Sequence, residues 1–146
     1  MYPSFIAVLT ALTATIAAFP HTTRNAALGS ATNFIEGCSP GGCIASFNIT
    51  APAGYVAGAP AYNVVCHPIY IQQGWLTCDA VGEQAAGSTV QSMWTGASER
   101  ELIKISVAHL FVDGETGAAK NASGFAEIEA GTTAFDVPVT SLTAVL

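Results

Sequence analysis

The feature that most constrains this chain is the stretch 62–78, YNVVCHPIYIQQGWLTC, which has a cysteine near each end, Cys66 and Cys78. Its composition is typical of a β-hairpin or of two neighbouring strands. The other two cysteines, Cys38 and Cys43, precede it closely. Four cysteines in so short a span indicate a small β domain stapled by disulfides, provided that the chain reaches an oxidising compartment.

Residues 1–18, MYPSFIAVLTALTATIAA, have the layout of a secretory signal peptide. They carry no charged side chain, and an apolar run from Phe5 to Leu12 is followed by small residues. That run is shorter than the roughly 20 residues that a membrane-spanning helix needs. We therefore predict cleavage near Ala18 and a secreted, extracellular mature chain that begins near Phe19.

The charge balance narrows the classes of partner. The chain has 10 acidic and 4 basic residues, for a net charge of −6. Nucleic-acid binding needs clustered Lys and Arg against the phosphate backbone, and anionic membrane surfaces attract the same residues. We expect no nucleic acid and, after signal cleavage, no membrane as a partner. A length of 146 residues suits a single domain.

Apolar and polar residues alternate in several short segments that are separated by Gly- and Pro-rich turns. The strand candidates are 43–50, 61–67, 90–94, 100–113, 124–130 and 134–142. Alternation with period 2 at intervals of about ten residues predicts an all-β fold, a small antiparallel β-barrel or sandwich over residues 38–146. Residues 19–37 show no sustained period, so we predict a flexible N-terminal arm there.

The longest strand candidate, 100–113, has one strongly apolar face. We expect that face in the core; it carries Ile103, Ile105, Val107, His109 and Phe111. His109 is predicted to be a core or rim histidine with one hydrogen-bonded nitrogen. Near the C-terminus, Pro138 cannot donate a hydrogen bond to a neighbouring strand, so its strand should lie at a sheet edge or end at a bulge.

The spacing of the cysteines leaves their pairing open. If the two strands that flank the loop 51–60 pair symmetrically about residues 54–55, Cys43 lies opposite Cys66, which makes a reasonable disulfide. A Cys66–Cys78 bridge is equally reasonable. The segment CSPGGC at 38–43 can also fold back on itself. Four cysteines allow three connectivities.

The sequence contains no recognisable catalytic or metal-binding constellation. It has no GxSxG, HExxH or CxxC motif. The histidines His21, His67 and His109 are far apart, and a zinc site needs three or four ligands. Glu127 and Glu129 share a strand face, but a glycosidase pair must line a cleft that so small a domain hardly offers. We predict no catalytic residue, no metal and no cofactor.

Four residues are candidates for surface sites. Two sequons, at Asn48 and Asn121, can carry N-glycans, the first on an outward strand face and the second in a turn; an unmodified surface Asn is the alternative. Tyr55 and Tyr70 fall in predicted loops and are the candidate exposed aromatic pair of a binding surface.

Taken together, the pattern resembles the Alternaria major-allergen-like family of small secreted fungal proteins. The resemblance covers roughly residues 38–140. It rests on a strand that ends in Cys66, a hairpin of about a dozen residues, Trp75-Leu-Thr-Cys78, and the long strand with Val107-Ala-His109. It implies a compact β-barrel with a Cys66–Cys78 disulfide, which leaves Cys38–Cys43 as the second bridge. The later cysteine pair of that family has no counterpart here, and its dimer arrangement does not carry over.

The same resemblance implies a non-enzymatic role at the fungus–host interface, as an effector, elicitor or allergen. The partners it implies are a host extracellular protein or a small phenolic ligand. The first alternative is a binding module for carbohydrate or a small hydrophobic ligand, which would show an exposed aromatic row or a lined cavity. A small secreted hydrolase would show a His–carboxylate–Ser cluster in a cleft, and an enzyme inhibitor a protruding rigid loop such as 51–60.

Overall fold

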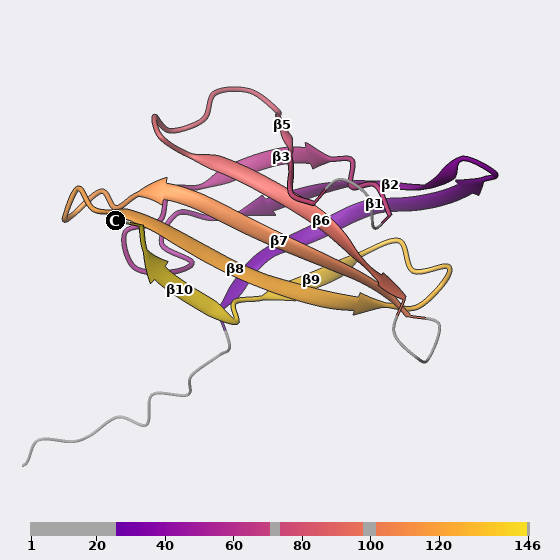
Figure 1. Cartoon of the computed structure of the whole chain (residues 1–146). Coiled ribbons are helices and arrows are strands. Elements are labelled where there is room, and N and C mark those ends of the chain that lie inside the picture. Colours follow the sequence, from indigo (N-terminus) through magenta and orange to yellow (C-terminus); the bar gives the residue numbers. More distant parts are fainter. Residues whose placement is uncertain (1–25, 71–73, 98–101, 146) are drawn as a thin grey trace, which may run out of the picture.

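A computed structural model describes residues 26–70, 74–97 and 102–145 (Figure 1). The predicted signal peptide, 1–18, and its cleavage site near Ala18 lie outside these residues. No helix long and apolar enough to cross a membrane is found in the part of the chain that the structure describes.

The chain forms two five-stranded antiparallel sheets, and the described residues include no helix. In order across the sheet, sheet A contains β5 (Asp79–Ala80), β3 (Tyr62–Cys66), β2 (Gly42–Ala51), β1 (Ala27–Ser39) and β9 (Phe135–Pro138). Sheet B contains β10 (Ser141–Ala144), β8 (Ala119–Ile128), β7 (Ile103–Val112), β6 (Thr89–Ala97) and β4 (Leu76–Thr77). The predicted all-β fold with two disulfides is therefore confirmed.

The chain passes between the sheets at both edges. On one side β4 leads through Cys78 into β5, and on the other β9 leads into β10. At the second crossing Thr140 N donates to Ser123 O at 2.9 Å. A Cβ added to Gly124 would lie 1.8 Å from Pro138 O. Only glycine allows this close approach between β8 and β9. Pro138 lies in an edge strand, as predicted.

The core lies between the sheets and is built from their inward faces. The predicted inward face of β7 is confirmed, since Ile103, Ile105, Val107, His109 and Phe111 are all buried. In the segments 43–50 and 61–67 the two-residue period predicts shared faces in the same way. The residues of those faces are buried: Ala45, Phe47, Ile49, Tyr62, Val64 and Cys66. Period-2 alternation therefore identified which side of these strands faces the core.

The predicted flexible arm is wrong for residues 27–37, which belong to β1, the longest strand of the structure. Leu28, Ala31 and Phe34 are buried. A bulge between Thr32 and Ile35 shifts the register, and Asn33 adopts a positive φ of 54°. An inserted residue breaks the two-residue period, which is why the alternation was not visible in the sequence.

The predicted register of β2 and β3 is also wrong. Phe47, not Cys43, lies opposite Cys66, so the pairing is displaced by four residues. The connecting loop contains a turn in which Gly54 N donates to Ala59 O at 2.8 Å, and this turn accommodates the four-residue displacement. An even shift keeps the same side chains inward, so the prediction of the faces remained correct.

Both disulfides expected from the family resemblance are present. Cys38–Cys43 joins β1 to β2 beside the turn at residues 40–41, and Cys66–Cys78 joins β3 to the crossing between β4 and β5. Cys66 and Cys78 are buried, whereas Cys38 is exposed. The first bridge therefore holds an exposed hairpin tip and the second lies in the core.

Candidate binding groove on the outer face of sheet A

The β1–β2 hairpin extends beyond the other strands at one end of the molecule (Figure 1). Past the bulge its pairs are Ile35↔Ser46, Gly37↔Ile44 and Cys38↔Cys43. The chain after β3 continues beside β2 in the same register. Ala45 N donates to Pro68 O and Tyr70 N donates to Cys43 O, each at 3.0 Å.

A cavity of about 440 Å³ lies on this part of the sheet. Its apolar walls are Ile35, Ile44 and Ile69, and the small residues Gly37 and Ser46 lie between them. Between β1 and β2, Ile35 is paired with Ser46 and Ile44 with Gly37, so the outward face is hollowed rather than flat. The volume lies in the range of small-molecule sites, about 300–1,000 Å³.

The walls of this groove are unusually exposed for isoleucine. Ile35 is 67% exposed and Ile44 is 61% exposed. Single exposed apolar residues are ordinary on protein surfaces, but adjacent ones that line one hollow mark a contact site. The exposed His67 and Glu36 supply polar groups at the groove. The arrangement can therefore hold an apolar group and orient it with one or two hydrogen bonds.

A second cluster of side chains surrounds His109 of β7, at the end of the molecule opposite the β1–β2 hairpin tip. Its Nδ1 lies 2.7 Å from Tyr55 Oη, and its Nε2 lies 2.7 Å from Ser88 Oγ. Tyr55 comes from the β2–β3 loop and Ser88 from the loop before β6. The imidazole is 0% exposed, and the Tyr62 ring packs edge-on at 4.7 Å. Both nitrogens are hydrogen-bonded, which corrects the prediction of a single bonded nitrogen.

The Ser88–His109 contact has the geometry of a hydrolase dyad, but its electrostatics differ. Burial lowers the pKa of His109 to about 4, so the ring is neutral at pH 7 and a weak base. Its Nδ1 partner is a tyrosine hydroxyl, and burial raises the pKa of that hydroxyl. A catalytic triad uses a carboxylate at this position to stabilise the imidazolium. The chain of hydroxyls and imidazole suits a structural link between two loops.

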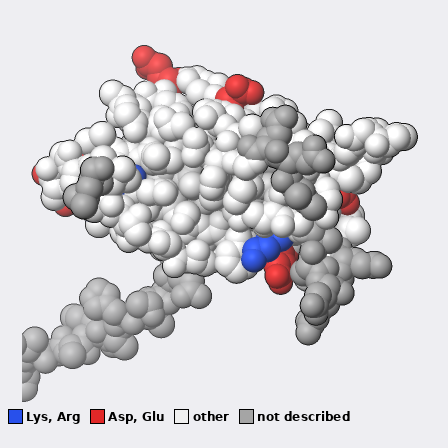
Figure 2. All heavy atoms as spheres, in the orientation of Figure 1, with Lys and Arg blue, Asp and Glu red and all other residues white. Residues whose placement is uncertain are grey.

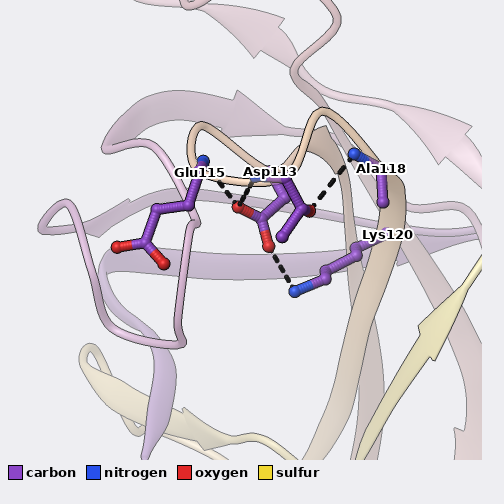
Figure 3. Close-up of polar contacts among 5 residues, drawn as sticks. Asp113, Glu115, Ala118 and Lys120 are labelled. Carbon is purple, nitrogen blue, oxygen red and sulfur yellow. Dashed lines mark hydrogen bonds and ion pairs between the residues drawn. The ribbon is translucent and has the colours of Figure 1, made fainter.

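A partly buried ion pair between Lys120 and Asp113 lies at the same end of the molecule (Figure 3). The Asp113 carboxylate is paired with Lys120 and accepts hydrogen bonds from the backbone N–H of Glu115 at 2.8 Å and Thr116 at 3.2 Å. The hydrogen bond from Lys120, followed by that from Glu115, lowers the pKa of Asp113. Gly58 of the β2–β3 loop packs against this carboxylate, and Gly114 N donates to Gly58 O at 3.2 Å.

The two tyrosines predicted to be exposed are both half-buried against the core. Tyr55 bonds to His109, and Tyr70 packs edge-on against Trp94 at 5.2 Å. They lie at different ends of β6 and β7, and the structure does not bring them together into one surface. Trp75 is instead 41% exposed. A predicted loop position was a poor guide to exposure, because Tyr55 is hydrogen-bonded to the buried His109 and Tyr70 is bridged to the buried Trp94.

The two sequons have different surroundings. Asn48 lies in β2 on the outward face, as predicted, and is half-buried. Asn121 lies in β8 between Leu110 of β7 and Thr143 of β10, so its predicted place in a turn is wrong. The Asn121 Oδ1 is buried and has no hydrogen-bond partner among the described residues. Glycosylation at either position stays a prediction.

The sequence contained one signal for the groove. Ile44 belongs to the outward set of the alternating segment 43–50, where a polar residue is expected. Ile35 could not be recognised, because the bulge hid its strand. His67 and Ile69 follow β3 and reach the groove only because the chain stays paired with β2 beyond Cys66.

Comparisons with protein-family models, with curated proteins and with solved structures found no significant match to this chain. The resemblance to the Alternaria allergen-like family therefore stays a prediction.

Proposed function

We propose that this chain is a secreted, non-enzymatic binding protein of fungal type that acts at a host or cell-wall interface. The observation that carries the proposal is an apolar groove. Ile35 and Ile44 of the protruding, disulfide-closed β1–β2 hairpin form it together with Ile69, which follows β3. Folding leaves Ile35 and Ile44 exposed and Ile69 half-buried, and an exposed apolar surface of this kind is commonly kept for a partner.

The disulfides support the extracellular part of the proposal. Both bridges are formed, and disulfides persist chiefly in oxidising compartments. The sparse charge agrees with this. Figure 2 shows a face on which the few Lys, Arg, Asp and Glu side chains are widely scattered. A surface of this kind attracts neither nucleic acid nor anionic lipid.

The state of His109 supports the non-enzymatic part. Among the described serines and threonines, Ser88 is the one whose hydroxyl contacts an imidazole. That imidazole is fully buried, and its other nitrogen is bonded to the Tyr55 hydroxyl and not to a carboxylate. A base with a pKa of about 4 activates a serine poorly at neutral pH.

The shape and lining of the groove indicate an apolar ligand group. An aromatic ring, as in a small phenolic compound, fits between isoleucine walls, and its hydroxyl can bond to His67 or Ser46. An apolar side chain of a host extracellular protein fits in the same way. A carbohydrate usually stacks on aromatic rings, and the described residues that line this groove include no Phe, Tyr or Trp, which favours an apolar ligand group over a carbohydrate.

The test is a titration with Nile red, an uncharged apolar dye, monitored by fluorescence. The variant Ile44→Ser removes one wall, and we expect it to weaken binding by about tenfold or more, the equivalent of burying one isoleucine side chain. Val81→Ser, which changes an exposed apolar residue outside the groove, is the matched control and should bind as the parent does. Equal affinity for all three proteins would overturn the groove as the site. Labelling of Ser88 by a fluorophosphonate would overturn the non-enzymatic assignment.

A further inference from the structure

Among the described residues, nothing pairs with the outer edge of β1 where it passes the groove. β9 pairs with Ala27–Ala31 of β1, and past the bulge the last bond on that side is from Phe34 N to Thr133 O, at 2.9 Å. No other strand of the described chain lies beside residues 35–39 on this side. The segment is an open sheet edge that is continuous with the exposed Ile35.

The direction of the free backbone groups follows from the alternation of an antiparallel ladder. Cys43 O and Ala45 N are hydrogen-bonded to the chain after β3, so the backbone N–H and C=O groups of these two residues point away from β1. Their partners on β1, Cys38 and Glu36, must then direct their N–H and C=O groups away from β2. Two donors and two acceptors therefore point outward along one edge.

A second cavity lies beside this edge. Its volume is about 220 Å³, and it is lined by Phe34, Ile35 and Glu36 of β1 and by residues 131–133 of the β8–β9 loop. Ile35 and Glu36 belong to this cavity and to the larger groove alike. A strand added to this edge of β1 would therefore lie next to both cavities, the groove on the outer face of the sheet and the smaller cavity at the β8–β9 loop.

We propose that this edge and the groove together form a β-addition site for an extended segment of another protein. The segment would pair with Glu36 and Cys38 and place alternate apolar side chains beside Ile35 and Ile44. Main-chain hydrogen bonds supply affinity in this mode of recognition, and pockets for alternate side chains supply specificity. The inference rests on the proposed binding function and names the class of partner.

Charge determines what kind of segment fits. The chain carries a net charge of −6, and Glu36 lies at the centre of the open edge. A second copy, paired about a twofold axis near this residue, would bring two Glu36 carboxylates together, and like charges across neighbouring strands are unfavourable. A segment with Lys or Arg near Glu36 and apolar residues at alternate positions is complementary. The occupant is therefore a basic, apolar, extended polypeptide of a different protein.

The test is a selection from a displayed library of random peptides of about twelve residues, long enough for one edge strand. The parent protein is compared with Glu36→Pro and Glu36→Gln. Proline removes an N–H that the β1–β2 ladder does not use, whereas glutamine keeps that N–H and removes the charge. We expect the retained peptides to alternate apolar and basic residues and to lose about tenfold in affinity for Glu36→Pro, as lost edge hydrogen bonds require. Glu36→Gln should cost less and should reduce the salt dependence.

Amide hydrogen exchange of the parent protein gives a measurement that needs no variant. A bound peptide should slow exchange at Glu36 and Cys38 and leave Gly37, which the ladder already bonds to β2, unchanged. Retained peptides that bind Glu36→Pro as tightly as the parent would overturn the edge proposal, and so would unchanged exchange or an empty selection. Loss of Nile red binding in Ile44→Ser would still support the groove in each of those cases. Self-association of the parent with protection of the same amides would overturn the choice of a different protein as occupant.

Discussion

The two ends of the molecule differ in what they bury and what they expose. We call one end the loop end, because three connections lie together there: the β2–β3 loop, the loop before β6 and the β7–β8 turn. Each polar side chain of this end is hydrogen-bonded: Tyr55, Ser88, His109 and Asp113. At the hairpin end, β1 and β2 project with exposed isoleucines and an open edge. The loop end stabilises the fold, and the hairpin end remains available for contact.

This contrast has a physical basis. A buried polar group is costly unless its hydrogen bonds are made, so the loop end tolerates little change. An exposed isoleucine contributes little to folding, because it is not removed from water in the free protein. Substitutions should therefore affect stability at one end and binding at the other.

The largest expected effect is that of Gly58→Ala at the loop end. The added Cβ would lie 2.2 Å from Asp113 Oδ1, and Gly58 has a φ of +78°. We expect a loss of roughly 2–5 kcal/mol in the free energy of unfolding, from backbone strain together with the steric conflict. Urea denaturation measures it.

Gly54→Ala is the matched control in the same loop. Gly54 has a φ of +76°, but nothing lies within 4 Å of its added Cβ. Its cost should be the backbone strain alone, about 1–2 kcal/mol. Equal losses for the two variants would show that the packing of Gly58 on Asp113 does not matter for stability.

Acid should weaken the loop end next. The unfolded chain protonates His109 near its ordinary pKa of 6.5, but the folded chain does so only near pH 4. Protons thus bind preferentially to the unfolded state in this window, so stability falls as the pH is lowered from about 7 to 4, by up to about 3 kcal/mol. Urea midpoints measured across this range would show the decline.

A substitution of each histidine identifies the source of that decline. His109→Gln should flatten the dependence on pH between 7 and 4, at some cost in overall stability. His67→Gln, at the exposed rim of the groove, is the matched histidine substitution with which that flattening is compared. Below this pH window the free energy of unfolding falls further because of Asp113, whose pKa is lowered in the folded state. Protonation of its carboxylate removes the ion pair with Lys120. A slope that survives in His109→Gln would contradict the assignment to His109.

The smallest effect on stability is expected at the hairpin end. Removing the tip disulfide with Cys38→Ala and Cys43→Ala opens a loop with a sequence separation of only 5. The chain-entropy relation gives a loss of at most about 2 kcal/mol. The pair Cys66→Ala and Cys78→Ala opens a separation of 12 in the core and should cost about 3 kcal/mol or more. Calorimetric melting of both variants would test the order, and a larger loss at the tip would reverse the comparison.

Local pattern was enough to predict the strands that keep a strict two-residue period. In 43–50, 62–66 and 103–112 the inward faces follow from the sequence, because neighbouring side chains of a strand point to opposite sides. The same reasoning failed at β1, where Asn33 is inserted at a bulge, and at Tyr55 and Tyr70, whose side chains pack against the core.

The sequence by itself determined the all-β class, the inward faces of β2, β3 and β7, and the outward isoleucine at 44, since these depend on the order of residues within one strand. Tertiary structure alone decided the register of β2 and β3, the joining of Ser88 to His109, and the meeting of Ile35, Ile44 and Ile69 around one hollow. Those features depend on which distant strands become neighbours and on how the loops between them fold. That choice is made by packing the whole core at once, and no single segment contains it.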